Sequence, residues 1–189
     1  MKKVEEIRDI LEKNDYKKLK SILHEYHPVD IAEFYEELSS QESINLFKVL
    51  DFDDAVQVLE EIDSDKKFFI LTNIKPSYAS KLIAEMSSDD VADLLGDLEE
   101  EEKKRILSLI GENEQADLKD LLAYGKNTAG GRMTTEYIAF PKDLKAKDAL
   151  NKLGELALDA ETIYYVFAVD SEGRLVGVVS LRDLILAPE

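Results

Sequence analysis

Residues 87–98 read SSDDVADLLGDL, a twelve-residue pattern that recurs along much of the chain. The eighth, ninth and twelfth residues are Leu94, Leu95 and Leu98, and their i, i+1, i+4 spacing places them on one stripe of an α-helix. Ser87 precedes this helix, where its hydroxyl can accept a hydrogen bond from a free backbone N–H group. The stretch therefore predicts an amphipathic helix of about two to three turns.

Other stretches of twelve residues follow the same pattern, and with residues 87–98 they run without a break from His27 to Ile110. They are HPVDIAEFYEEL, SSQESINLFKVL, DFDDAVQVLEEI, DSDKKFFILTNI, KPSYASKLIAEM and EEEEKKRILSLI. Each of these twelve-residue stretches is called a line below. Helices this short are unstable alone, so they must stack against one another as helical hairpins, each made of two lines, with a period of 24 residues. The regularity favours a superhelical all-α solenoid over an ordinary helical bundle. Two further helices, Val4–Leu11 and Tyr16–Leu23, are expected to cap the stack.

The chain is strongly acidic, with 41 acidic against 24 basic residues and a formal net charge of -17. Because phosphate binding needs a basic surface, this balance argues against nucleic acid as a partner and favours cations or basic protein surfaces. Cysteine is absent, which excludes disulfides and thiolate chemistry. The sequence holds no apolar run of about 18 residues, so it predicts no membrane-spanning helix.

Carboxylates crowd residues 85–102, which contain nine of them and no lysine or arginine. Asp89, Asp93 and Asp97 are spaced i, i+4, i+8 and form a ridge opposite the leucine stripe, with Asp90 beside it. Like charges at this spacing destabilise a helix by roughly 0.2–0.5 kcal/mol per pair, so the ridge calls for a counter-charge. A hard divalent cation such as Mg²⁺ suits oxygen ligands. The alternative is a solvated acidic face without a ligand.

The pattern changes to a mixture of strands and helices after Gly131. The expected elements are a strand at 137–140, a helix at 143–157, a strand at 163–169, a strand at 175–179 and a last helix capped by Ser180. A turn is expected at 170–174, where Gly173 is available for a positive φ. The predicted fold class is therefore α+β, an all-α solenoid followed by a single βαββα domain.

This order of elements, ending in GRLVGVVSLRDL, resembles a CBS domain. In that family a Ser/Thr-x-x-Asp at the start of the last helix often meets the ribose of an adenine nucleotide, and Ser180 and Asp183 hold those two places. The N-terminus of a helix also favours phosphate. The alternative is that the two residues form only a helix cap.

Five stretches together resemble the cytosolic part of the MgtE magnesium transporter family, over almost the whole chain: HPVDIAEFYEEL, SSDDVADLL, TAGGRMTTEYIAF, DAETIYYVFAVD and GRLVGVVSLRDLI. The resemblance implies an acidic N domain at 1–126, a glycine-containing junction at 127–136 and a first CBS domain at 137–189. It implies a homodimer through the CBS domains at the cytoplasmic face of the cell membrane. A second CBS domain and a transmembrane pore domain are expected in the same protein, outside this chain.

The family resemblance also implies the ligand sites. Mg²⁺ between acidic surfaces of the N and CBS domains holds a compact state in which the pore is closed. The metal candidates in this chain are Asp89 and Asp93 with the carbonyl of Gly131, and Asp90 and Asp97 complete the acidic set.

The candidates for binding an adenine nucleotide, ATP among them, are Tyr165, Ser180, Arg182 and Asp183. The chain departs from the family pattern at Lys66 and Lys67, which stand where acidic residues are common.

The sequence thus favours a Mg²⁺-sensing regulatory region over an α-solenoid or CBS adaptor that binds proteins or senses nucleotides. Catalysis is not expected. His24 and His27 are spaced i, i+3 and could in principle share a metal, but His27 precedes Pro28 at a repeat boundary, which favours a surface or capping role. There is no Walker-type phosphate loop, and no base is expected near Ser180 by motif.

Overall fold

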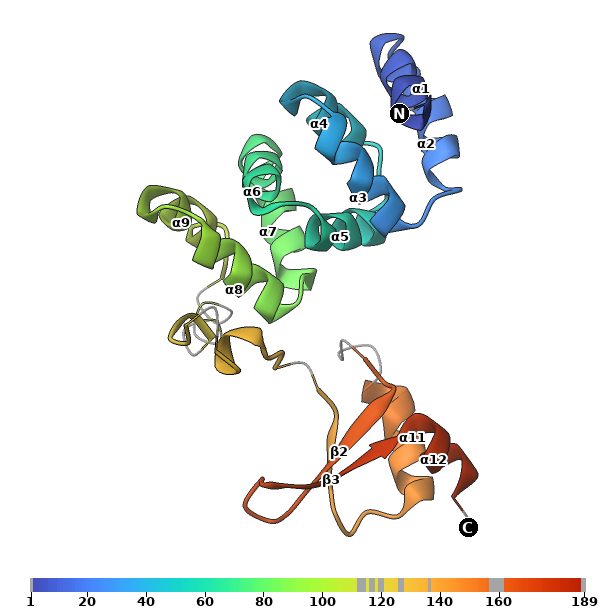
Figure 1. The fold of residues 1–189 in the computed structure, drawn as a ribbon, viewed down its shortest axis with the longest axis vertical. Coiled ribbons are helices and arrows are strands. Elements are labelled where there is room, and N and C mark those ends of the chain that lie inside the picture. Colours follow the sequence, from blue (N-terminus) through green and yellow to red (C-terminus); the bar gives the residue numbers. More distant parts are fainter. Residues whose placement is uncertain are drawn as a thin grey trace. The chain divides into compact units, whose positions relative to one another are not determined.

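The computed structural model describes residues 2–111, 115, 118, 121–125, 128–135, 137–156 and 162–187. It contains two compact units, Met1–Arg132 and Met133–Glu189 (Figure 1). The first unit is helical, and the second combines a small sheet with helices. Among the described residues, no helix is long and apolar enough to cross a membrane.

Each of the seven twelve-residue lines forms one helix of the first unit. The helices are α3 (Pro28–Glu37), α4 (Ser40–Phe47), α5 (Phe52–Glu61), α6 (Ser64–Asn73), α7 (Pro76–Glu85), α8 (Ser88–Asp97) and α9 (Glu100–Leu107). They follow two helices at the N-terminus, α1 (Lys2–Glu12) and α2 (Tyr16–Leu23). Proline occupies the first turn of α3 and α7, where its missing N–H group leaves no hydrogen bond unmade.

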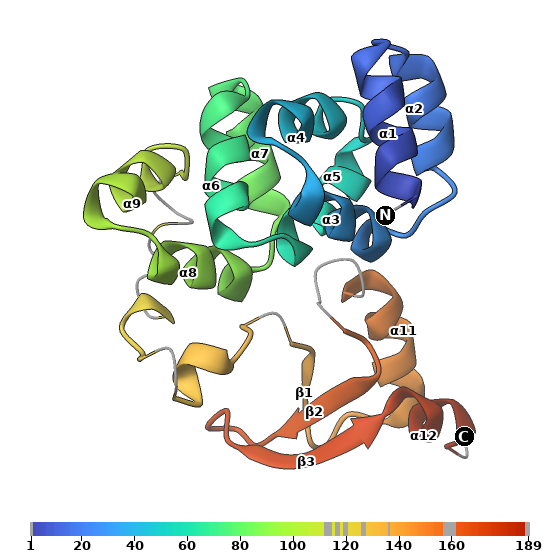
Figure 2. The same ribbon diagram turned by 45° about the horizontal axis from the view of Figure 1, so that its top comes forward.

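Helices two lines apart pack against each other, as the 24-residue period predicts. Helix α3 packs on α5, α4 on α6, α5 on α7, and α6 on α8. Figures 1 and 2 show the resulting succession of short hairpins from α1 to α9. This arrangement is the predicted solenoid.

The predicted stripe forms the core of the solenoid. The eighth residue of every line is 5% exposed or less: Phe34, Leu46, Val58, Ile70, Leu82, Leu94 and Ile106. The ninth and twelfth residues are buried too, except Leu107 and Ile74, which are partly buried against the same core. Burying a leucine or isoleucine contributes about 1.5–3 kcal/mol, so each short helix is stabilised mainly by its neighbours.

The predicted helix caps form at some line boundaries and not at others. Ser39 and Glu42 make a complete capping box on α4. The side chains of Asp51, Asp63 and Ser87 make no capping hydrogen bond, which corrects the expectation for these lines. Asp51 instead contacts side chains of α2, and the Ser87 hydroxyl donates to the Asp90 carboxylate.

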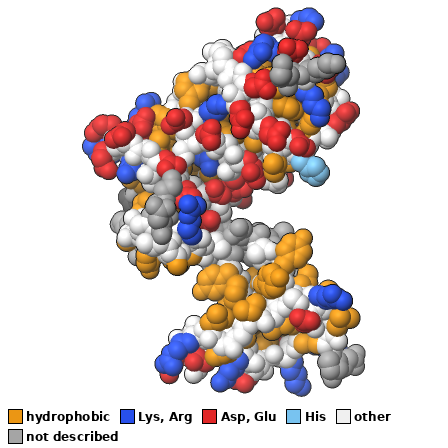
Figure 3. Space-filling model, in the orientation of Figure 1, with side chains coloured by type: hydrophobic (Ala, Val, Ile, Leu, Met, Phe, Trp, Pro, Cys, Tyr) orange, Lys and Arg blue, Asp and Glu red, His pale blue; other side chains and the backbone are white. Residues whose placement is uncertain are grey.

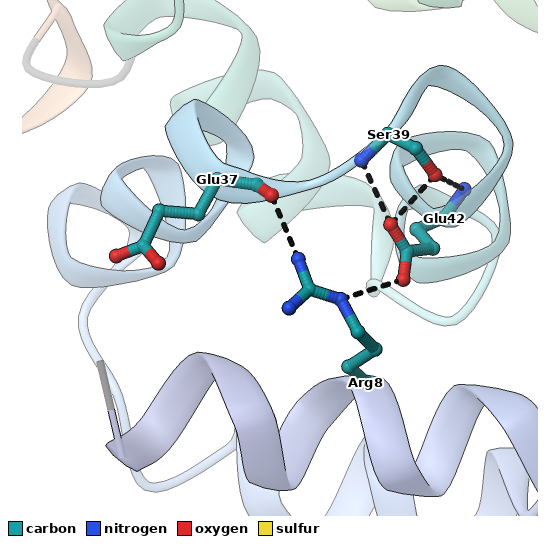
Figure 4. A network of polar contacts seen from close by, with 4 residues as sticks. All are labelled: Arg8, Glu37, Ser39 and Glu42. Carbon is teal, nitrogen blue, oxygen red and sulfur yellow. Dashed lines mark hydrogen bonds and ion pairs between the residues drawn. The ribbon is translucent and has the colours of Figure 1, made fainter.

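Arg8 of α1 fastens the N-terminal helix to the junction between α3 and α4 (Figure 4). Its Nε donates to Glu42 Oε1 at 2.9 Å, and its Nη2 donates to the Glu37 carbonyl at 2.8 Å. Glu42 Oε2 also accepts hydrogen bonds from the Ser39 hydroxyl and backbone N–H group. The bonds from Ser39, followed by those from Arg8, lower the pKa of Glu42.

The second unit is a three-stranded sheet with two helices. Strand β1 (Ala139–Pro141) pairs in parallel with β2 (Tyr165–Val169), which pairs antiparallel with β3 (Leu175–Ser180). Helix α11 (Ala146–Leu156) connects β1 to β2, and α12 (Leu181–Leu186) follows β3. The βαββα order is as predicted, and Gly173 has the positive φ, 76°, that the turn between β2 and β3 was expected to need.

The boundaries of the second unit differ from the sequence prediction by a few residues. Helix α11 begins at Ala146 rather than residue 143, because residues 142–143 form a turn after the strand. Strand β2 begins at Tyr165 rather than residue 163, because its pairing with β3 begins with Tyr165 opposite Ser180. Residues 126, 127, 136 and 157 lie outside the described residues, so the proposed domain limits there stay predictions.

The Glu42 network predicts a pH-dependent loss of stability in Glu42→Gln. Because the folded pKa of Glu42 is lowered, its charged contacts stabilise the protein fully above the unfolded pKa near 4.5 and are lost as the pH falls through the folded pKa. We expect Glu42→Gln to lower the free energy of unfolding by about 1–2 kcal/mol at pH 7, with the difference vanishing at low pH. Urea unfolding at several pH values measures it. Gln41→Ala, an exposed substitution on the same helix, is the control, and a pH-independent deficit in Glu42→Gln would contradict the assignment.

Candidate functional site: an acidic face with a buried lysine, and a surface depression on the small unit

The acidic ridge of α8 lies partly against another helix. Asp89 and Asp93 are half-buried and Asp97 is exposed. Helix α6 packs on α8, and the Ser64 hydroxyl of α6 donates to Asp97 Oδ2 at 2.8 Å. The ridge that was predicted opposite the leucine stripe is therefore partly covered by the helix two repeats earlier in the chain.

A lysine from α6 supplies part of the counter-charge that the ridge calls for. Lys67 is only 4% exposed, and its Nζ lies 3.9 Å from Asp90 Oδ1. Burial lowers the pKa of Lys67, and the charges of Asp90, Glu60, Asp93 and Glu61, in that order, oppose the shift. Asp90 is therefore within ion-pair distance of a basic side chain that residues 85–102 themselves do not contain.

The period of the solenoid could have located this lysine from the sequence. Lys67 lies 24 residues before Val91, which follows Asp90. Equivalent positions of lines two apart face each other where α6 packs on α8. The i, i+4 spacing of the ridge relates residues of one helix only, so it does not predict a contact with the lysines of DSDKKFF.

The carboxylates of α8 differ in how much of their hydrogen-bonding capacity is used. Asp90 Oδ2 accepts from the Ser87 hydroxyl at 2.7 Å, while its Oδ1 faces Lys67. Asp89 Oδ1 is buried and has no hydrogen-bond partner among the described residues. A buried carboxylate oxygen without a partner is unfavourable by several kcal/mol unless a ligand satisfies it. Asp89 is thus the acid of this face best suited to hold a cation.

The glycine pair of TAGG forms a tight turn at the end of the first unit. Residues Gly130–Arg132 make a 3₁₀ turn, η1, in which the Gly131 N–H group donates to Thr128 Oγ1 at 3.2 Å. The Thr128 hydroxyl donates in turn to the Gly125 carbonyl at 2.8 Å. A Cβ atom at Gly130 would overlap the Tyr124 ring, so the turn needs a glycine at this position for the close approach of Tyr124.

On the small unit, three of the four nucleotide candidates line one open depression of about 900 Å³. Tyr165, Ser180 and Arg182 all border it. Asp183 does not border it. It is bonded to Ser180, whose hydroxyl donates to Asp183 Oδ2 at 2.7 Å and accepts from the Asp183 N–H group at 3.1 Å. The predicted helix cap is therefore present.

Apolar side chains are exposed around this depression and on the adjoining strand. More than half of the surface of each of these is exposed: Tyr164, Tyr165, Leu175, Val176, Val178, Ile185 and Leu186. Figure 3 shows hydrophobic side chains gathered on the smaller unit and acidic ones crowding the helical unit. Contiguous exposed apolar surface of this kind is typical of an interface.

The fold and these faces define a two-unit protein in which an acidic α-solenoid precedes a CBS domain. Sequence profiles agree: that of the MgtE intracellular N domain matches residues 26–127, and that of the CBS domain matches residues 129–189. The chain belongs to the MgtE family.

Relatives of known identity are magnesium transporters. The chain is 33% identical over 184 residues to the magnesium transporter MgtE of Thermus thermophilus, covering 96% of this chain and 41% of that protein. It is 38% identical over 176 residues to the magnesium transporter MgtE of Enterococcus faecalis, covering 92% of this chain and 38% of that one. The chain therefore spans about two fifths of the length of the curated relatives it matches.

Two crystal structures resemble the chain over nearly its whole length. The cytosolic domain of the Mg²⁺ channel MgtE in complex with ATP matches with a TM-score of 0.87 and 32% identity, covering 98% of this chain and 76% of that one. The soluble part of a magnesium transporter matches with a TM-score of 0.83 and 32% identity, covering 99% of this chain and 74% of that one.

Proposed function

We propose that this chain is the cytosolic, Mg²⁺-sensing regulatory region of a magnesium transporter or channel. The observation that carries the proposal is the buried Oδ1 of Asp89, which has no hydrogen-bond partner in the described part of the chain and lies one turn from Asp93 on the acidic face of α8. The similarity to the MgtE cytosolic domain supports it. The ligand set proposed for the ion is Asp89, Asp93 and the Gly131 carbonyl, with Asp90 and Asp97 contributing charge.

The mechanism is a linkage between ion binding and the arrangement of the two units. Carboxylates that face each other repel unless a divalent ion lies between them, so an ion that binds only the compact arrangement stabilises it by mass action. Mg²⁺ gives up its water reluctantly, which suits weak sites that keep part of the hydration shell. Such sites respond at the millimolar concentrations at which this ion is abundant. Filling them favours the closed state of the pore.

The proposal includes the partners and the setting of the chain. The exposed apolar surface of the CBS unit supports pairing with another CBS domain, both within a homodimer and with a second CBS domain of the same protein. The pore domain of the full-length protein would lie in the membrane, with this region at its cytoplasmic face. Residues 1–126 would form the N domain, 127–136 the junction and 137–189 the first CBS domain.

The proposal predicts that Mg²⁺ stabilises and contracts the chain through Asp89 and Asp93. At ten times the dissociation constant an ion stabilises its bound state by about 1.4 kcal/mol, which raises the melting temperature by roughly 3–6 °C. We expect Asp89→Ala with Asp93→Ala to abolish both this rise and the decrease in radius of gyration. Calorimetry and small-angle scattering across a millimolar MgCl₂ titration measure the two effects.

The matched control is Glu5→Ala with Asp9→Ala, an exposed i, i+4 acid pair on α1 with the same change of charge. It is expected to respond to Mg²⁺ as the unchanged chain does. NaCl of equal ionic strength distinguishes the alternative of a protein-binding adaptor, which predicts no preference for Mg²⁺. Equal responses to both salts would contradict the proposal.

Lys67 is predicted to weaken Mg²⁺ binding, because the ion must share its carboxylates with a fixed ammonium group. A unit charge about 6 Å from a divalent ion costs on the order of 1–3 kcal/mol at effective dielectric constants of 40 to 80. Lys67→Met keeps most of the buried volume and removes the charge. We expect it to lower the Mg²⁺ concentration at half-maximal stabilisation about tenfold.

Lys81→Met is the control for this experiment, because it removes an exposed lysine of α7 from the same unit. It is expected to shift the Mg²⁺ midpoint much less. Weaker binding in Lys67→Met than in the unchanged chain would show that the lysine supports the site instead of competing for it.

A second proposed ligand is an adenine nucleotide in the depression bordered by Tyr165, Ser180 and Arg182, with Asp183 oriented by the cap. The relative solved in complex with ATP supports this assignment. Because Arg182 would pair with phosphate, Arg182→Ala is expected to weaken ATP binding about tenfold or more in titration calorimetry. Arg174→Ala, in the turn before β3, is the control. No detectable heat with millimolar ATP, or equal losses in both variants, would contradict it.

A further inference from the structure

An imidazole and two carboxylates converge on the first unit, away from α8. His24 is the C-cap residue of α2, Asp51 is the N-cap residue of α5, and Asp54 lies in the first turn of α5. One ligand atom from each lies within 4.8 Å of the other two. The His24 Nε2 and Asp51 Oδ2 atoms are 3.3 Å apart. The i, i+3 spacing in the sequence pairs His24 with His27, whereas in the structure His24 lies beside acidic residues of a different helix.

The Asp51 carboxylate is half exposed and contacts two basic side chains instead of capping its helix. A helix-capping position usually uses its side chain to accept an N–H hydrogen bond, and Asp51 makes none. Its Oδ1 instead accepts from the ammonium group of Lys20, and its Oδ2 faces His24. A cationic group is thus already bound at this carboxylate.

The local charges favour a cation at this place. The C-terminal end of α2, next to His24, carries the negative end of the helix dipole. The first turn of α5 holds Asp53 and Asp54 beside the capping Asp51, and three carboxylates outweigh the partial positive charge of about one half at that helix end.

We propose that His24, Asp51 and Asp54 form a binding site for a divalent transition metal of the Zn²⁺ class. An imidazole nitrogen combined with two carboxylate oxygens suits Zn²⁺, whose remaining position water fills, whereas Mg²⁺ prefers oxygen alone. Ligands about 2.0–2.2 Å from a metal are roughly 3–3.5 Å apart. Rotation of the exposed His24 and Asp51 side chains is enough to reach that separation. The metal would fasten the α1–α2 hairpin to α5, a role independent of Mg²⁺ sensing.

The two histidines of the chain make a residue-specific test possible. NMR spectra of the unchanged chain show two imidazole signals, which His24→Ala and His27→Ala assign. On addition of ZnCl₂ we expect the His24 signal to shift and the His27 signal to stay. Titration calorimetry is expected to give a micromolar dissociation constant for Zn²⁺ in the unchanged chain and in His27→Ala, and at least a tenfold weaker one in His24→Ala.

Two further variants test the roles of the neighbouring groups. Asp54→Asn is expected to weaken Zn²⁺ binding, and Lys20→Met to strengthen it by freeing Asp51 Oδ1. The four substituted residues are all at least partly exposed: Lys20, His24, His27 and Asp54. Circular dichroism checks that each variant folds. Equal Zn²⁺ affinity in the unchanged chain and His24→Ala, or a shift confined to His27, would overturn the proposal. These variants keep Asp89 and Asp93, so they are expected to respond to Mg²⁺ as the unchanged chain does. A failure of the Zn²⁺ proposal can thus be told apart from a failure of the Mg²⁺ proposal.

Discussion

The structure of the first unit depends on one constraint: helices of eight to ten residues must bury a three-residue apolar stripe against neighbours two lines away. The stripe fixes which face of each helix is inside, and the constant line length fixes which helices meet. The place of every charged side chain on the outer faces follows from these two facts. Lys67 reaches Asp90 because α6 must pack on α8, and for no reason local to either helix.

On the acidic face, the proposed Mg²⁺ would share the carboxylates with the side chain of a buried lysine. Lys67 neutralises part of the negative charge there, and the Ser87 hydroxyl satisfies Asp90. The buried oxygen of Asp89 is left without a partner among the described residues. A face neutralised only in part is suited to sensing, since it keeps repelling other acidic surfaces until a further cation arrives. Burial disfavours the charged form of Lys67 and lowers its pKa, while the negative charges of Asp90 and its neighbours oppose that shift, so the balance is sensitive to a single substitution there.

Much of this fold could be predicted from the sequence, because its signals are periodic or chemically specific. The stripe located all seven helices of the repeat, and the turn glycine Gly173 and the cap of Ser180 followed from backbone and hydrogen-bond chemistry. For the candidate sites, the sequence predicts which face of a helix carries the acidic residues, but it does not predict which side chains contact each other there. Whether Ser87 caps its helix or donates to Asp90 depends on which of two competing hydrogen-bond partners its hydroxyl takes, and residue types alone do not reveal that choice. The His24 and Asp51 contact joins two helices with a whole hairpin between them, beyond any local pattern.

The most direct test of the central claim is a crystal structure of this chain grown with Mn²⁺ in place of Mg²⁺, read by anomalous scattering. The account predicts an anomalous peak about 2.0–2.3 Å from a carboxylate oxygen of Asp89 or Asp93, with the Gly131 carbonyl and water completing the coordination. Anomalous peaks found only elsewhere, with Asp89 Oδ1 satisfied by a protein group, would contradict it.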